Sequence, residues 1–188
     1  MDFLYKYQNK KNYRFDLFNL SLQIAKKRDF KIFVETGVSR GKNFLYFFSK
    51  KNWKDGMSTM MFSEYSSIYN AHLYTCDISM QNIKSAQRFC RKFKKNVTFI
   101  CEDSLNFLQN FNKKIDFLYL DSLDGYLEEA NEHQLKEIQI ANEKLSNNAL
   151  ILLDDKNTKS KLSMRFLSES GFKIIQDTEN QVLYSKHV

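Results

Sequence analysis

The sequence predicts a single α/β domain in which helices cover both faces of a mostly parallel, seven-stranded sheet, a doubly wound arrangement. Two observations support this prediction. Five short apolar segments alternate with segments of helical periodicity, as in parallel strands joined by helical crossovers. Two further apolar segments, residues 172–176 and 181–185, flank the turn-forming sequence Asp177-Thr-Glu-Asn180, which predicts a C-terminal antiparallel hairpin at the edge of the sheet.

The N-terminal part is predicted to hold a helical cap, a first strand and an insertion. Residues 1–28 form the cap, with an amphipathic helix over 13–28 that packs on the sheet or covers the site. Residues 32–34 are the first strand, and a helix is expected over 43–49 after a glycine-bearing turn. Residues 51–70 fit neither periodicity, so we interpret them either as a lid insertion or as a surface loop with a short helix.

Strands and helices alternate regularly from residue 72 onwards. Strands are predicted at residues 72–77, 97–101, 115–120 and 149–153, and helices at residues 80–93, 104–110, 127–145 and 162–168. A strand followed by a helix and a further strand is the repeating unit of a parallel sheet. These segments therefore supply the remaining parallel strands and the helices on the two faces.

The composition limits the class of protein. At 188 residues the chain fits one domain spanning 1–188, and no apolar run approaches the roughly 20 residues that a membrane span requires. The N-terminus lacks the features of a secretory signal, so we expect a cytoplasmic protein that does not bind membranes. The net charge of +7 is spread over scattered lysine pairs, which favours solvated surface over a nucleic-acid footprint. The aromatic-rich N-terminus is a candidate homodimer contact.

The turn after the first strand is the most informative motif. It reads Glu35-Thr-Gly-Val-Ser-Arg-Gly41, and its glycines let backbone approach a ligand at the end of a strand, where doubly wound proteins bind nucleotides. Dinucleotide-binding proteins use Gly-x-Gly-x-x-Gly, but Val38 and Ser39 stand where the middle glycine would fall. The spacing therefore argues against a dinucleotide cofactor and an NAD-dependent dehydrogenase. A purely structural turn is the alternative.

An acidic residue follows each of the five predicted parallel strands. Because the carboxyl ends of parallel strands meet at one edge of a sheet, we expect these acids to border one crevice. They are Glu35, Asp77, Glu102 with Asp103, Asp121, and Asp154 with Asp155. Solvated loop acids would explain any one of them, and Asp103 is also placed to cap the helix that follows it. The set as a whole favours a functional cluster.

The first turn and the strand-end acids resemble those of class I S-adenosylmethionine-dependent methyltransferases, whose fold is a Rossmann-like seven-stranded sheet. The resemblance implies that the first turn surrounds the amino acid part of the cofactor, that Asp77 binds the ribose hydroxyls, and that Asp103 and Ser104 lie beside the adenine. The cofactor-binding residues that it implies are Glu35, Thr36, Gly37, Ser39, Gly41, Asp77, Ile78, Asp103, Ser104 and Asp121.

Residues 116–126 and 150–155 resemble a more specific group within this class, the small bacterial relatives of the catechol and caffeoyl-coenzyme A O-methyltransferases. This resemblance implies methyl transfer to a hydroxyl of a small molecule or sugar. In the metal-dependent members, one acid after the fourth strand and two residues after the fifth hold a divalent cation. The matching residues here are Asp121, Asp154 and Asp155, and oxygen ligands suit Mg²⁺ or Mn²⁺. Such a cation would bind the substrate hydroxyl and lower its pKa.

The catalytic base and the substrate class stay open at this stage. Those relatives often carry a lysine shortly after the first metal acid, whereas this chain has Asp124 there. Asp124 and His133 are the alternative bases, beside Asp121 as a third catalytic candidate, and a surface or capping role is the alternative for His133. A nucleic-acid methyltransferase is a second interpretation, although the chain has no proline for the Asn/Asp-Pro-Pro-aromatic motif of amino-methylating enzymes. A non-catalytic binding protein that retains the fold is the third.

Overall fold

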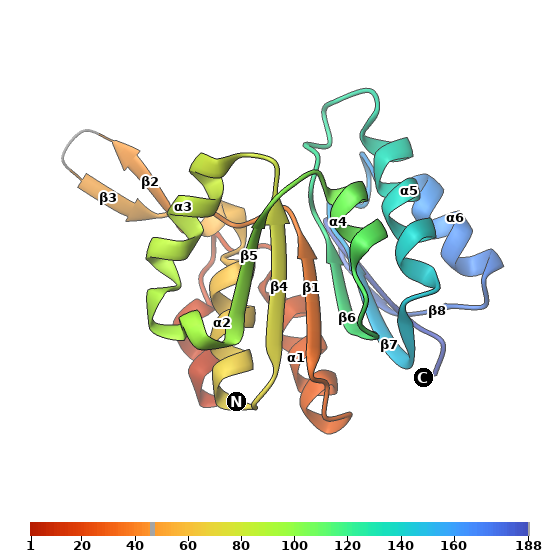
Figure 1. Cartoon of the computed structure of the whole chain (residues 1–188), viewed down its shortest axis with the longest axis horizontal. Helices are drawn as coiled ribbons and strands as arrows, with labels where there is room; N and C mark the ends of the chain where they lie inside the picture. Colours follow the sequence, from red (N-terminus) through yellow and green to blue (C-terminus); the bar gives the residue numbers. More distant parts are fainter. Residues whose placement is uncertain (46–47, 188) are drawn as a thin grey trace.

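A seven-stranded, mostly parallel sheet forms the centre of the molecule (Figure 1). The computed structural model describes residues 1–45 and 48–187. The strands of the sheet are β1 (Ile32–Thr36), β4 (His72–Asp77), β5 (Val97–Cys101), β6 (Ile115–Leu120), β7 (Leu145–Leu153), β8 (Lys173–Asp177) and β9 (Val182–Ser185). Their order is β5-β4-β1-β6-β7-β9-β8, and only β9 pairs antiparallel, with β7 and β8. The predicted doubly wound sheet with its C-terminal hairpin is confirmed.

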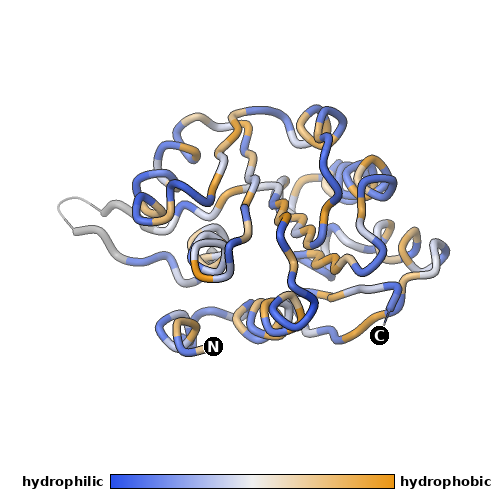
Figure 2. Tube along the Cα trace, turned by 60° about the horizontal axis from the view of Figure 1, so that its bottom comes forward, coloured by the Kyte–Doolittle hydropathy of each residue, from blue (hydrophilic) through white to orange (hydrophobic). Residues whose placement is uncertain are grey.

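Helices cover both faces of this sheet. They are α1 (Phe15–Lys27), α2 (Ser58–Ile68), α3 (Met80–Phe89), α4 (Ser104–Asn110), α5 (Ala130–Asn142) and α6 (Lys161–Glu169), with short 3-10 helices η1 (Asp2–Tyr7), η2 (Trp53–Asp55) and η3 (Arg91–Asn96). The helices predicted at residues 80–93 and 127–145 are therefore shorter than expected. Figure 2 shows the strands in the middle of the molecule as largely apolar segments between the helices.

The side chains along each strand point alternately to the two faces of the sheet, and this divides the core into two halves. Phe33 and Phe117 point to the face covered by α1 and α2, whereas the following residues, Val34 and Leu118, point to the face covered by α4, α5 and α6. Successive strand side chains point to opposite faces, so both faces must be apolar in a sheet that is covered on both sides. Each such side chain, once fully buried, stabilises the fold by about 1.5–3 kcal/mol.

The segment between β1 and β4 differs from its prediction. The helix expected over residues 43–49 is wrong, because β2 (Lys42–Leu45) and β3 (Phe48–Lys51) pair as a separate antiparallel hairpin. The hairpin projects from the body of the domain (Figure 1). Residues 46–47, which also fall in the predicted helix, lie outside the described residues. The crossover helix of this unit is α2, further along the chain.

The interpretation of residues 51–70 as a lid or as a surface loop with a short helix does not describe residues 58–68, which form the core helix α2. Met57, Met61 and Tyr65 recur every four residues and are at most 1% exposed, so α2 lies flat on the sheet as a core helix. The inserted part of the chain is the hairpin with η2. None of the described helices is long and apolar enough to cross a membrane.

Candidate functional site: a crevice at the strand ends

Two adjoining cavities open at the carboxyl ends of the strands. The smaller, of about 80 Å³, is lined by residues from β4, α4 and α5, and the larger, of about 260 Å³, extends toward the loops after β6 and β7. Residues common to both linings are Gly37, Asp77, Ile78, Ser122 and Leu123. The two cavities therefore form one crevice, at the point where the chain switches from one half of the sheet to the other. Ligands of doubly wound folds bind at this point.

The turn at Gly37 forms the floor where the two cavities meet. Gly37 has a φ of +82° and donates its N–H to the carbonyl of Cys76 at 2.9 Å. A Cβ atom there would lie 2.2 Å from the carbonyl oxygen of Asp121. Only glycine fits, because both the left-handed backbone and the close approach exclude a side chain. The first turn is thus held directly against the end of β6.

Asp77 presents a fixed carboxylate to the crevice. Its Oδ1 accepts the backbone N–H of Ser79 at 2.8 Å, and both oxygens accept from the Asn82 amide at 3.2 Å. The backbone N–H of Val38 lies 3.4 Å from Oδ2. A carboxylate has about four lone-pair sites, and these four contacts, three of them long at 3.2–3.4 Å, hold the group at the edge of the crevice. Asp77 therefore borders the crevice at the end of β4, as expected for a strand-end acid.

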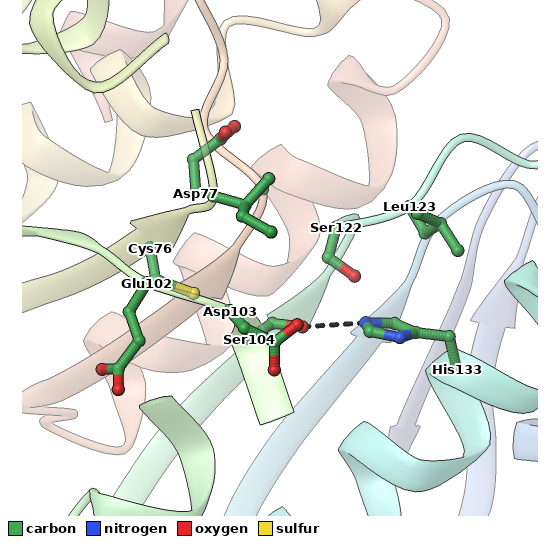
Figure 3. A pocket seen from close by; sticks show the side chains of 10 residues that line it. Cys76, Asp77, Glu102, Asp103, Ser104, Ser122, Leu123 and His133 are labelled. Atoms are coloured by element: carbon green, nitrogen blue, oxygen red, sulfur yellow. Dashed lines mark hydrogen bonds between the residues drawn. The ribbon is translucent and has the colours of Figure 1, made fainter. Parts of the chain in front are cut away.

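The smaller cavity ends at Asp103, Ser104 and His133 (Figure 3). Asp103 caps α4 by accepting the N–H groups of Leu105 and Asn106, and Ser104 Oγ lies 2.9 Å from His133 Nε2. Figure 3 shows Asp77 on one side of this cavity and His133 on the other. The sequence offers His133 as a catalytic base. Its ring faces the smaller cavity, because its position near the start of α5 directs it toward α4, and it does not line the larger cavity that Asp124 borders.

Glu35 does not line either cavity, contrary to the expectation that it contacts a cofactor. Its fully buried carboxylate accepts hydrogen bonds from Ser58 at 2.6 Å, Thr59 at 2.8 Å and Thr75 at 2.7 Å. Burial raises the pKa of Glu35 to about 7, although the hydroxyl donors oppose the rise. The carboxylate fastens the N-terminus of α2 to the sheet, where a helix dipole favours negative charge.

The remaining residues of the predicted motif support the turn from behind. Ser39 donates its backbone N–H to Thr59 Oγ1 at 2.8 Å, and Thr36 accepts the N–H of Asp121 through its carbonyl at 2.9 Å. Neither residue, nor Gly41, lines the two cavities. Thr36, Ser39 and Gly41 thus shape the backbone around the crevice without facing it.

The acids after β6 and β7 converge, as predicted. Carboxylate oxygens of Asp121, Asp154 and Asp155 lie within 4.8 Å of one another. Two cations already bind them. Arg14 donates through Nε to Oδ1 and Oδ2 of Asp154 at 2.8 and 2.6 Å, and Lys159 Nζ lies 2.8 Å from Asp121 Oδ1.

The same two cations also hold Asp155. Arg14 Nη2 lies 3.1 Å from its Oδ1, and Lys159 Nζ lies 3.3 Å from its Oδ2. The last oxygen of the group, Oδ2 of Asp121, accepts from the Tyr119 hydroxyl at 3.1 Å. All six carboxylate oxygens therefore have donors from the protein itself. The residues present do not fit a divalent cation, because its ligand positions are taken by fixed positive groups.

Sequence reasoning missed both cations. Lys159 lies at the fourth position after Asp155, and a turn in which Asp155 has a φ of +51° and accepts the N–H groups of Thr158 and Lys159 directs the lysine back to the strand ends. This i, i+4 spacing was the available signal. The side chain is only 2% exposed. Burial lowers the pKa of Lys159, but the neighbouring carboxylates outweigh it and the net pKa is raised, so the ammonium stays charged.

Asp124 occupies an open position on the larger cavity. Together with Asp121 and Asp155 it lines that cavity, and its Oδ2 accepts from the exposed Tyr126 hydroxyl at 3.1 Å. Desolvation raises the pKa of Asp121, but Lys159 and Arg14 outweigh it and lower the pKa below its usual value, so that carboxylate is a poor proton acceptor. Asp124 is therefore the candidate base that the geometry leaves available to a substrate.

Solved structures of methyltransferases share this fold. The SAH-bound methyltransferase PaMTH1 of Podospora anserina superposes with a TM-score of 0.65 at 14% identity, covering 88% of this chain and 76% of that one. The O-methyltransferase NovP superposes with a TM-score of 0.67 at 11% sequence identity, and the match covers 92% of this chain and 79% of NovP. An rRNA methylase from Streptococcus thermophilus superposes with a TM-score of 0.61 at 13% sequence identity, and the match covers 89% of this chain and 94% of the methylase.

The sequence itself also matches a known family. No curated protein matches it, but a family model described as a methyltransferase domain matches residues 53–156, more than half of the chain. The match runs from η2 through α2 to the end of β7 and includes every strand-end acid except Glu35. Fold, crevice and family model agree, and the chain belongs to the methyltransferase domain family.

Proposed function

We propose that this protein transfers a methyl group from S-adenosylmethionine to a hydroxyl of a small molecule or sugar. The observation that carries the proposal is the continuous crevice with two different ends. Its smaller end combines Gly37, Asp77 and Ser104, and its larger end exposes Asp124. One end suits a nucleoside and the other a hydroxyl that must lose a proton.

The residues at the smaller end fit this cofactor. The absent side chain at Gly37 lets the first turn lie against the end of β6 and form the floor of the crevice. The Asp77 carboxylate borders the crevice, and two ribose hydroxyls would replace its longer contacts, at 3.2–3.4 Å. The Ser104 to His133 contact closes the cavity beside Asp103. S-adenosylmethionine, when bound, supplies an electrophilic sulfonium methyl group. The binding of SAH by PaMTH1, a protein of the same fold, supports the assignment.

The larger end supplies positioning and a proton acceptor. A hydroxyl oxygen held in this cavity would form its bond to the methyl carbon as the bond from that carbon to the sulfonium sulfur breaks, with SAH as the leaving group, and we assign the acceptance of its proton to the Asp124 carboxylate. Holding the two reacting groups in line accounts for much of the rate of such reactions. The O-methyltransferase NovP has the same fold, which supports a hydroxyl acceptor.

The test combines cofactor binding with turnover. Calorimetry on the full chain should show binding of S-adenosylmethionine and SAH, and label from the methyl group should appear in one or more members of a panel of phenols, catechols and sugars. Asp124→Asn should retain SAH binding and lose turnover, whereas Tyr126→Phe, which removes only the hydrogen bond to Asp124, should keep most of it.

Three results would contradict the proposal. Absence of SAH binding would exclude the cofactor. Label transferred to RNA instead, with a steep dependence on salt, would identify a nucleic-acid methyltransferase, an activity that the rRNA methylase fold and the net charge of +7 also accommodate. SAH binding without transfer to any of these acceptors would favour a binding protein.

A further inference from the structure

We infer that Lys159 and Arg14 take the place of a divalent cation among the strand-end acids, so that this site orients the acceptor end of the crevice without a metal. The part of the inference that concerns turnover rests on the proposed function. The part that concerns metal binding does not. Lys159 and Arg14 are assigned here as positioning residues.

Lys159 occupies the gap in which a cation would bind. Its ammonium bridges Asp121 Oδ1 at 2.8 Å and Asp155 Oδ2 at 3.3 Å, and its third bond goes to the carbonyl of Leu123 at 2.9 Å. An ammonium has three donors, so the group is saturated. At 2% exposure the side chain is almost completely buried in this position.

Arg14 closes the cluster from the other side. Its guanidinium binds both oxygens of Asp154, which is completely buried, and one oxygen of Asp155. Binding of both oxygens of one carboxylate is typical of the planar guanidinium group of arginine. The two cations bring two positive charges to three carboxylates, the same charge that one divalent metal ion would bring.

The cations also tie together segments that a metal bound only to the acids would leave separate. Arg14 donates through Nη1 to the carbonyl of Lys54 at 2.8 Å, which joins the N-terminal cap to the inserted segment. Lys159 holds the loop after β6 through Leu123. Leu123, Asp124 and Lys54 all line the larger cavity. The network therefore fixes the walls of the acceptor site, including the loop that carries Asp124.

The experiment measures Mn²⁺ binding by calorimetry and the melting temperature with and without Mn²⁺. The wild-type protein should show no saturable binding at millimolar Mn²⁺ and no change in melting temperature with Mn²⁺ or EDTA. Lys159→Met removes the bridging ammonium and leaves two carboxylates facing each other, so it should bind Mn²⁺ at least tenfold more tightly and melt higher when the ion is present. Lys156→Met is the matched control, because that lysine pairs with Asp177 outside the cluster.

Tight Mn²⁺ binding by the wild-type protein would overturn the inference, whether or not the Lys159 variant folds. A Lys159→Met variant that folds but gains no Mn²⁺ affinity over Lys156→Met would also count against it. Once an acceptor is known, wild-type turnover should be unchanged by EDTA, and a loss of turnover that Mn²⁺ restores would refute the metal-free assignment. Failure to find any acceptor would affect the proposed function and leave the Mn²⁺ measurements decisive.

Discussion

Replacing Gly37 with alanine tests whether the first turn is the wall of the cofactor crevice. The new Cβ would lie 2.2 Å from the Asp121 carbonyl oxygen and 2.9 Å from the Ser122 Cα atom. Both contacts are with backbone, which cannot rotate away as a flexible side chain could. The turn must therefore shift away from β6, and with it the N–H of Gly37 and the neighbouring cofactor position.

The magnitude follows from two contributions. An alanine at a φ of +82° costs about 1–2 kcal/mol because its Cβ crowds the carbonyl in the left-handed conformation. Relief of the clash by moving backbone costs about 1–3 kcal/mol more, as in overpacked cores. Gly37→Ala should therefore lower the free energy of unfolding by about 2–5 kcal/mol. The same shift would displace the backbone that borders the smaller cavity, so the Kd for SAH should rise about tenfold or more, which corresponds to about 1.4 kcal/mol of binding free energy.

The chain offers a matched control in Gly171→Ala. Gly171 has the same φ of +82°, but no atom lies within 4 Å of the position that its Cβ would take, so this variant carries the conformational cost without the clash. Urea denaturation should place Gly37→Ala about 1–3 kcal/mol below Gly171→Ala, and calorimetry should show normal SAH binding for Gly171→Ala alone. Equal stability of the two variants together with wild-type SAH affinity in both would refute the placement of the turn.

Three further predictions concern single side chains around the crevice. Asp77→Asn removes the charge that would bind the ribose, so its Kd for SAH should rise about tenfold or more, and an unchanged Kd would exclude the assignment. His133→Gln should raise the Kd for SAH and leave kcat at saturating cofactor close to the wild-type value, because the ring closes the smaller cavity. A fall in kcat without a change in the Kd for SAH would instead indicate that His133 acts as the catalytic base. Folded Glu35 keeps its proton up to a pKa of about 7, against 4.5 in the unfolded chain. The folded state thus binds more protons between these values, and the free energy of unfolding should fall by up to about 3 kcal/mol as the pH rises through this window. Glu35→Gln should remove that part of the pH dependence, and parallel curves for the two proteins would contradict the buried carboxylate.

The sequence by itself determined the order and type of most elements. Apolar runs of five or six residues and helical spacing are local properties, so β4, β5, β6 and the C-terminal hairpin were predicted at or near their observed bounds. The acids at the strand ends were equally accessible, since parallel strands bring their carboxyl ends to one edge. The same reasoning failed between residues 42 and 68, where a hairpin precedes the crossover helix and displaces it along the chain.

Only the tertiary structure decided which acids face the crevice. Glu35 shares the face of Phe33, two residues before it, and α2 covers that face, so the carboxylate is buried under Ser58 and Thr59. A strand pattern gives the alternation but not which helix lies above each face. Asp77 and Asp124, which lie at loop ends, keep access to the cavities.

The character of the acid cluster was also decided by tertiary contacts alone. Lys159 reaches Asp121 across 38 residues of sequence, and Arg14 reaches Asp154 across 140. The three carboxylates by themselves match a metal site in residue type and position. Whether such a cluster binds an ion depends on the positive groups packed against it, because these set the net charge and occupy the ligand positions. Apart from the i, i+4 spacing of Asp155 and Lys159, contacts across such separations leave no local pattern, so the folded chain is needed to show that the acids are already paired.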